Sequence, residues 1–235
     1  MGVKSICSRV YNRACSIINE QRDKKVMRRV VVIESDDWGS IRVPSRNVYD
    51  ALMAEGYAMD KRPYERYDCL ETDEDVKVLS DVLLKYKDKN GRHPVLTLNY
   101  LSANPDFRKI KEKGYTEYIY EDVSNTYSRY PQSTNVIQMV KDGIEQGIFM
   151  PQCHGREHFN VNDWLNALRK GDKDVMTAFG YGMCGIFPKV DPAKGNKYMV
   201  ALKSHDDESQ NMYVALWLNL LPCSVIFGGL LLARL

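Results

Sequence analysis

Short apolar runs alternate along the chain with segments in which apolar side chains recur every three or four positions. The runs predict buried strands, and the three-to-four-residue spacing predicts helices that bury one face. Strands are expected at Val30–Ile33, Pro94–Tyr100, Ile148–Cys153 and Tyr198–Leu202. Helices are expected at Ser45–Glu55, at Asp73–Lys85, at Asn135–Gln146, and from Asn160 or Asn162 to about Arg169. Strands that alternate with helices in this way indicate α/β architecture with parallel strand pairing.

The two ends of the chain have patterns of their own. Apolar positions within residues 3–18 form a helical stripe flanked by lysine and arginine, which predicts a basic amphipathic helix over residues 1–29. We interpret this helix as packed on the protein, and contact with an anionic membrane is the alternative. Residues 213–233 carry no charge and are long enough to cross a bilayer. A buried core segment explains this tail equally well, and an accidental end from a lost reading frame is a third possibility.

Composition narrows the class of protein. The chain has 235 residues, of which 44% are hydrophobic and 27% charged, as in ordinary globular proteins. The net charge is +2 and there is no zinc-finger or P-loop pattern, so no nucleic-acid partner is expected. The six cysteines are scattered, and the first residues lack the apolar stretch of a secretory signal peptide. Reduced thiols and a cytoplasmic location are therefore expected.

Two polar clusters follow predicted strands and contain the candidate chemistry. Ser35–Gly39 includes the adjacent carboxylates Asp36 and Asp37, and His154–His158 begins and ends with histidine. Because the carboxyl ends of parallel strands meet at one edge of a sheet, the two clusters can meet in space. Carboxylate and imidazole are ligands that zinc and other divalent metals accept, and three protein ligands leave a position for water. We predict a site for zinc or another divalent ion.

The same residues admit other interpretations. Neighbouring side chains on a strand point to opposite faces, so Asp36 and Asp37 can face one ion only where the strand has ended. Otherwise they are a loop pair that caps the next helix. The string H-G-R-E-H also fits the H-x-x-E-H pattern of inverted zinc peptidases, with Glu157 as the base. That pattern belongs to a long helix, whereas Gly155 and the strand before it favour a loop.

Longer motifs surround the two clusters. They are E-S-D-D-W-G-S-I-R at residues 34–42, A-N-P-D-F at 103–107, P-Q-C-H-G-R-E-H at 151–158 and H-F-N-V-N at 158–162. In this combination they resemble the polysaccharide deacetylases, carbohydrate esterase family 4, and especially a bacterial branch of deacetylase-like proteins. The similarity runs from about residue 30 to residue 202. It implies a (β/α) barrel that removes acetyl groups from a glycan or sugar conjugate.

The resemblance also implies a role for each polar residue. Asp36 would be the general base, and the ligands of zinc or another divalent ion would be Asp37, His154 and His158. Hydrolysis of an N-acetyl or O-acetyl group would then be assisted by the metal, because the ion polarises the carbonyl group.

The later motifs of this family have no counterpart in the sequence. After residue 202 there is no Trp-lined wall and no suitable histidine acid, and His205 stands among acidic residues. Four expected strands are too few for a closed barrel. We therefore expect an incomplete barrel over residues 30–210, followed by a hydrophobic tail at 211–235, and self-association through its exposed edges. The weak candidates for substrate binding are Trp38 and Arg156. The alternative is a non-catalytic metal- or glycan-binding protein tethered to a membrane by its tail.

Overall fold

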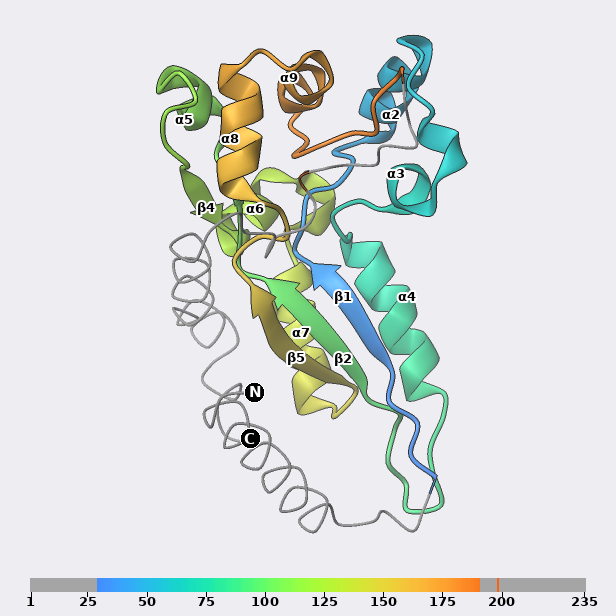
Figure 1. Ribbon diagram of the computed structural model, residues 1–235. Coiled ribbons are helices and arrows are strands. Elements are labelled where there is room, and N and C mark those ends of the chain that lie inside the picture. Colours follow the sequence, from blue (N-terminus) through green and yellow to red (C-terminus); the bar gives the residue numbers. More distant parts are fainter. Residues whose placement is uncertain (1–28, 191–197, 199–235) are drawn as a thin grey trace, which may run out of the picture. The chain divides into compact units, whose positions relative to one another are not determined.

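The computed structural model describes residues 29–190 and residue 198. The chain divides into two compact units, residues 1–32 and 33–235. The described residues of the second unit form a mixed α/β domain (Figure 1). The N-terminal helix and the hydrophobic tail lie outside the described residues. So does the strand expected at Tyr198–Leu202, apart from Tyr198, which is in a turn. In the part of the chain that is described, no helix has the length and apolar character needed to cross a membrane.

Three parallel strands form the central sheet in the order β1-β2-β5: β1 (Glu34–Trp38), β2 (Leu96–Leu101) and β5 (Phe149–Gly155). A second sheet pairs β3 (Ala103–Pro105) antiparallel with β4 (Tyr120–Asp122). The helices are α2 (Arg46–Ala54), α3 (Pro63–Tyr67), α4 (Asp73–Leu84), α5 (Phe107–Glu112), α6 (Val123–Arg129), α7 (Val136–Glu145), α8 (Val161–Arg169) and α9 (Lys173–Gly180), with 3-10 turns at Met59–Lys61 and Pro131–Ser133. The prediction of α/β architecture with parallel pairing is confirmed.

The helices begin where their capping residues predict. The side chain of Ser45 accepts a hydrogen bond from the backbone N–H of Val48 at the start of α2. The side chain of Asn160 accepts one from the N–H of Asp163 at the start of α8, so Asn160 rather than Asn162 is the cap. These bonds satisfy N–H groups that have no partner within the helix.

The first strand begins later than its apolar residues predict. Val30–Ile33 is expected to be a strand buried on both faces, but the side chains of Val30 and Val31 are 58% and 83% exposed. Pairing with β2 places Glu34 opposite Thr97, and β1 begins there. The prediction is wrong because β-branched residues favour an extended backbone without determining where the partner strand begins.

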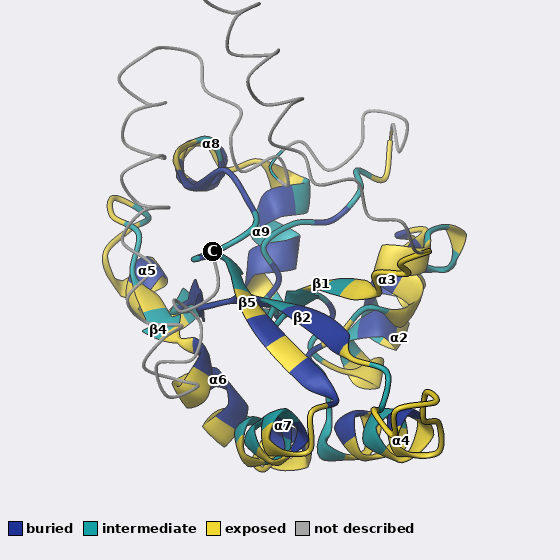
Figure 2. Cartoon of the chain, turned by 90° about the horizontal axis from the view of Figure 1, so that it is seen from below, coloured by how far each residue is buried: buried dark blue, intermediate teal, exposed yellow. Residues whose placement is uncertain are grey.

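The helices α4 and α7 pack on the same face of the sheet (Figures 1 and 2). α4 is the last helix before β2 in the chain, and α7 is the last helix before β5. Their apolar side chains share one core with the strands, which includes Val76, Leu83, Leu98, Tyr100, Val140 and Phe149. Burial of these side chains stabilises the sheet by roughly 1.5–3 kcal/mol for each large residue.

The other face of the sheet is polar. Asp36, Asn99 and Gln152 lie on it side by side, one from each strand, because Asn99 is opposite Gln152 and donates a hydrogen bond to Asp36. Met150, one pleat away on the same face, is 45% exposed. None of the described helices covers this face along the strands (Figure 2).

The remaining helices form a layer at the carboxyl ends of the three strands. α5, α8 and α9 share a core around the fully buried Trp164. α2 packs with Met59 and with residues after α9, including Met183 and Ile186. Figure 1 shows this layer beyond the tips of the strand arrows. The loops that leave β1 and β5 therefore run between the sheet and this layer, where a binding site can be enclosed.

Candidate metal centre

Asp37, His154 and His158 lie together at the carboxyl end of the sheet. Asp37 is next to the last residue of β1, His154 is near the end of β5, and His158 is in the following loop. One ligand atom of each residue lies within 4.8 Å of the other two. Oδ1 of Asp37 is 3.8 Å from Nε2 of His154, and the two imidazole rings are stacked with centroids 5.5 Å apart. The structure thus brings together three residues from the two predicted clusters.

The donor set fits a divalent metal ion. Among the described residues, Oδ1 of Asp37 and Nδ1 of His158 are buried and have no hydrogen-bond partner. Such atoms cost free energy unless a ligand satisfies them. Two ligand atoms on a tetrahedral zinc ion lie about 3.3–3.6 Å apart, because each is about 2.0–2.2 Å from the metal. Binding would therefore require the three donors, which lie within 4.8 Å of one another, to move closer together.

A kink in β1 turns Asp37 toward the histidines. Its φ angle is +64°, in the left-handed region, and the pairing with β2 is irregular between Ser35 and Trp38. Aspartate tolerates this conformation better than most residues, and backbone strain of this kind is common at functional sites. The expectation that the strand ends before the two carboxylates is wrong, because β1 continues to Trp38 and a single left-handed residue redirects the chain.

Asp36 lies outside the group of three ligand atoms. Its side chain is exposed, and Oδ1 accepts a hydrogen bond of 2.6 Å from Nδ2 of Asn99. Asp36 is thus next to a candidate ligand in the sequence, but it is not one of the three.

Arg42 holds the second oxygen of Asp37. Its Nη2 is 2.5 Å from Oδ2 of Asp37, and its Nε is 3.3 Å from Oδ2 of Asp68. A charge-assisted hydrogen bond of this kind orients the carboxylate and leaves Oδ1 on the side of the histidines. Sequence analysis did not identify Arg42, and its only signal was its place at the end of the motif at residues 34–42.

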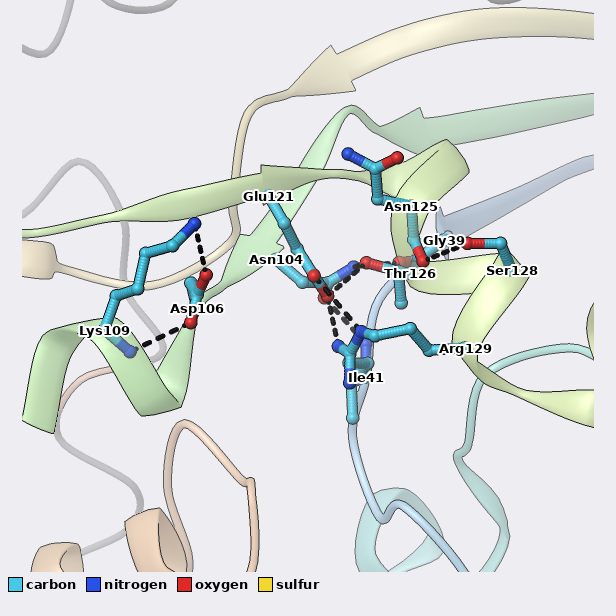
Figure 3. Close-up of polar contacts among 10 residues, drawn as sticks. All are labelled: Gly39, Ile41, Asn104, Asp106, Lys109, Glu121, Asn125, Thr126, Ser128 and Arg129. Carbon is cyan, nitrogen blue, oxygen red and sulfur yellow. Dashed lines mark hydrogen bonds and ion pairs between the residues drawn. The ribbon is translucent and has the colours of Figure 1, made fainter.

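Two side chains from distant elements hold the loop after β1. Asn104, on β3, donates from Nδ2 to the carbonyl of Gly39 at 2.7 Å and accepts the N–H of Ile41 at 3.0 Å (Figure 3). The carboxyl group of Glu71 accepts the N–H of Gly39 at 3.0 Å and the hydroxyl of Tyr127. These contacts fix the loop that follows Asp37, and sequence analysis gave neither residue this role.

Gly39→Ala is expected to lower the free energy of unfolding by about 2–4 kcal/mol. Gly39 has a φ of +82°, and an added Cβ would lie 2.6 Å from Cγ2 of Val123 and 3.0 Å from the carbonyl oxygen of Leu101. The matched control is Gly147→Ala, because Gly147 has a φ of +73° but a Cβ there meets nothing within 4 Å. The control should lose only about 1 kcal/mol in urea unfolding. Equal losses would show that the close packing of Gly39 has no effect.

The pH dependence of stability is expected to change in Glu71→Gln. Burial raises the pKa of the Glu71 carboxyl group to about 7, although hydrogen bonds from Tyr127 and Gly39 lower it. The ordinary value is 4.5, so the stability that this proton contributes is complete below that pH and is lost as the pH rises through about 7. The wild-type free energy of unfolding should therefore fall by about 3 kcal/mol more than that of the variant over this range. Urea unfolding at several pH values measures the difference. The control is Glu74→Gln, because Glu74 is at an exposed position of α4. Parallel curves for wild type and Glu71→Gln would contradict the prediction.

The two weak candidates for substrate binding make structural contacts. Trp38 packs against the core of the sheet, with its ring centroid 5.8 Å from that of Tyr100. Arg156 forms an ion pair with Glu157, and its guanidinium carbon is 4.8 Å from the ring centroid of Tyr120. A role in substrate binding for Trp38 or Arg156 stays a prediction.

The H-x-x-E-H string does not form a helix. His154 and Gly155 belong to β5, and the rest of the string is in the loop that follows. Both oxygens of the Glu157 carboxylate accept hydrogen bonds from Arg156. The structure therefore lacks the helix on which the metallopeptidase interpretation depends, and the carboxylate of Glu157 is held by the guanidinium group of Arg156.

A cavity of about 340 Å³ opens beside two of the three candidate ligands. Asp37 and His158 form part of its wall, and Arg42 and Glu157 also line it. Its volume is within the range of about 300–1,000 Å³ that is typical of small-molecule sites. The candidate metal centre therefore has space for a ligand next to it.

Comparisons with protein-family models, with curated proteins and with solved structures gave no match. The candidate function therefore depends on the motifs and on the geometry of the site.

Proposed function

We propose that the chain is a metal-dependent hydrolase that removes acetyl groups from a glycan or sugar conjugate. The observation that carries the proposal is the convergence of Asp37, His154 and His158, with two of their buried polar atoms lacking a partner among the described residues. The motifs that contain these residues resemble those of the polysaccharide deacetylases, which favours this reaction over other metal-assisted hydrolyses.

The arrangement of the sheet supports the proposal that the domain is a section of a deacetylase-type (β/α) barrel. In doubly wound folds, helices cover both faces of a parallel sheet, whereas in a barrel they cover only the outer face. Here α4 and α7 pack on one face, and the opposite face is polar. The candidate metal centre is at the carboxyl ends of the strands, where the sites of such barrels lie.

Each polar residue has a defined task in this proposal. Asp37, His154 and His158 hold the ion, for which zinc is the first choice because it accepts one carboxylate and two imidazoles. When bound, a divalent ion supplies Lewis-acid polarisation of the acetyl carbonyl and a lower pKa for water. Asp36 accepts the proton of the attacking water, and the amide of Asn99 orients its carboxylate.

The proposal is tested by acetate release from oligomers of N-acetylglucosamine and from an aryl acetate ester. The zinc-loaded full chain should release acetate, and Asp36→Asn should reduce the rate by about a hundredfold or more while keeping the metal. Asp81→Asn, which changes an exposed carboxylate on α4, is the matched control and should behave as wild type. Equal rates for Asp36→Asn and wild type would refute the role of Asp36, and no release by the wild type would refute the reaction.

A non-catalytic metal- or glycan-binding role is the second candidate. An amine leaving group must receive a proton from a donor, for which histidine is a common choice. Among the described residues, His93 is the one histidine besides the two candidate ligands. Its Nδ1 is 2.8 Å from the carbonyl oxygen of Tyr86, in an exposed loop. Glycan binding without acetate release would identify this second role.

A further inference from the structure

The cavity beside the candidate metal centre has mostly apolar walls. Ile41, Leu101, Phe159, Met183 and Phe187 line it, together with the polar residues of the site. A cavity of this kind binds its ligand through apolar contact and fixes its orientation through a small number of polar groups. The polar groups in the wall therefore indicate which ligand it takes.

Glu65 is a polar residue of the wall with a buried side-chain atom that no contact within the described residues satisfies. It lies on α3, lines the cavity and is 9% exposed. Its Oε2 atom is buried and has no hydrogen-bond partner there. Burial raises the pKa of this carboxyl group, and a hydrogen bond from its own backbone N–H, with the nearby Arg62 and Arg42, offsets that effect only in part. A buried carboxylate oxygen without a hydrogen-bond partner destabilises the protein, which favours a role in binding.

The partner that Glu65 lacks is a hydrogen-bond donor, because an ionised carboxylate only accepts hydrogen bonds. The other acidic groups of the cavity are already paired with cations: Asp37 with Arg42, and Glu157 with Arg156. A sugar ring presents hydroxyl donors at its edge and C–H groups on its faces, which matches one acceptor in an apolar wall. An acyl chain would contact the apolar wall but would leave Oε2 of Glu65 without a hydrogen-bond donor.

We propose that Glu65 accepts a hydrogen bond from a hydroxyl group of a sugar ring bound in this cavity, and so selects sugars as ligands. The inference rests on the proposed function, because it places that ring next to the ion held by Asp37 and His158. It adds a specificity residue that belongs to neither predicted cluster.

The test is the affinity of the zinc-loaded full chain for a short oligomer of N-acetylglucosamine, measured by isothermal titration calorimetry. Glu65→Ala is expected to raise Kd by about ten- to hundredfold. Glu65→Gln keeps the shape and one acceptor, and should raise Kd by a smaller factor. Glu74→Gln, an exposed change on α4, is the control and should bind as wild type. Glu65→Gln should also unfold at the same or a higher temperature, since it removes a buried charge.

Binding and reaction are measured separately, so the two proposals can fail separately. Unchanged Kd in both Glu65 variants, or a lower unfolding temperature without weaker binding, would overturn the inference and assign Glu65 a structural role. Tight binding of a polyamine in place of the oligomer would overturn it in favour of a cationic ligand. Weaker binding by the variants, without acetate release by the wild type, would support the role of Glu65 and refute the hydrolase.

Discussion

Asp37→Ala and His154→Ala are each expected to weaken the binding of zinc by more than about a hundredfold. Residues that only orient a ligand change metal affinity by about 10–100-fold, and removal of a ligand itself should exceed that. The three donors lie within 4.8 Å of one another, so the loss of one leaves too few ligands to hold the ion. Zinc content per chain, and competition with a chelator, measure the effect.

Two controls separate ligation from general damage. His93→Ala removes a partly exposed histidine that contacts the carbonyl of Tyr86, and Asp36→Ala removes the carboxylate adjacent to the ligand. Both should retain about one zinc per chain. Zinc should also raise the unfolding temperature of the wild type and of both controls, but not of Asp37→Ala. Stoichiometric zinc in His154→Ala would remove the basis for a three-residue site.

The convergence of the two polar clusters could be predicted from strand order, whereas the choice of Asp37 over Asp36 as a ligand came from the resemblance. Asp37 and His154 stand near the ends of parallel strands, and such ends meet at one edge of a sheet. The spacing of apolar residues predicted α2, α4, α7 and α8, because a helix that buries one face has apolar residues every three or four positions. The start of β1 could not be predicted, because it depends on where β2 begins to pair with it.

The residues that support the ligands could not be predicted. Asn104 contacts Gly39 over 65 positions of the chain, and Glu71 contacts it over 32. Gly39 and Asn104 belong to the motifs at residues 34–42 and 103–107, but no pattern in the sequence shows that they contact each other. Glu71 belongs to neither motif. The kink at Asp37 is a similar case, since nothing in the sequence shows that this residue has a left-handed backbone. Glu65 reaches the cavity from α3, whose sequence shows no sign of a site.

Asn104→Ala is expected to be the most destabilising single change in the loop network, with a loss of about 3–5 kcal/mol. Asn104 is 4% exposed and makes three hydrogen bonds, to Gly39, Ile41 and Thr126 (Figure 3). Alanine removes the partner of a buried N–H group and of a buried carbonyl, and each unsatisfied group costs about 1–3 kcal/mol. Urea unfolding measures the loss.

The adjacent Asn125 provides the control for Asn104. Its side chain is exposed and points away from Asn104 in Figure 3, and its backbone carbonyl, not its amide, accepts the hydroxyl of Ser128. Asn125→Ala should change stability by less than about 0.5 kcal/mol. Asn104→Asp keeps an acceptor for the N–H of Ile41 but places a second acceptor against the carbonyl of Gly39, so it should also be strongly destabilising. If the network positions Asp37, the folded fraction of Asn104→Ala should bind zinc about tenfold more weakly than wild type. Normal zinc affinity with reduced stability would limit Asn104 to a role in folding.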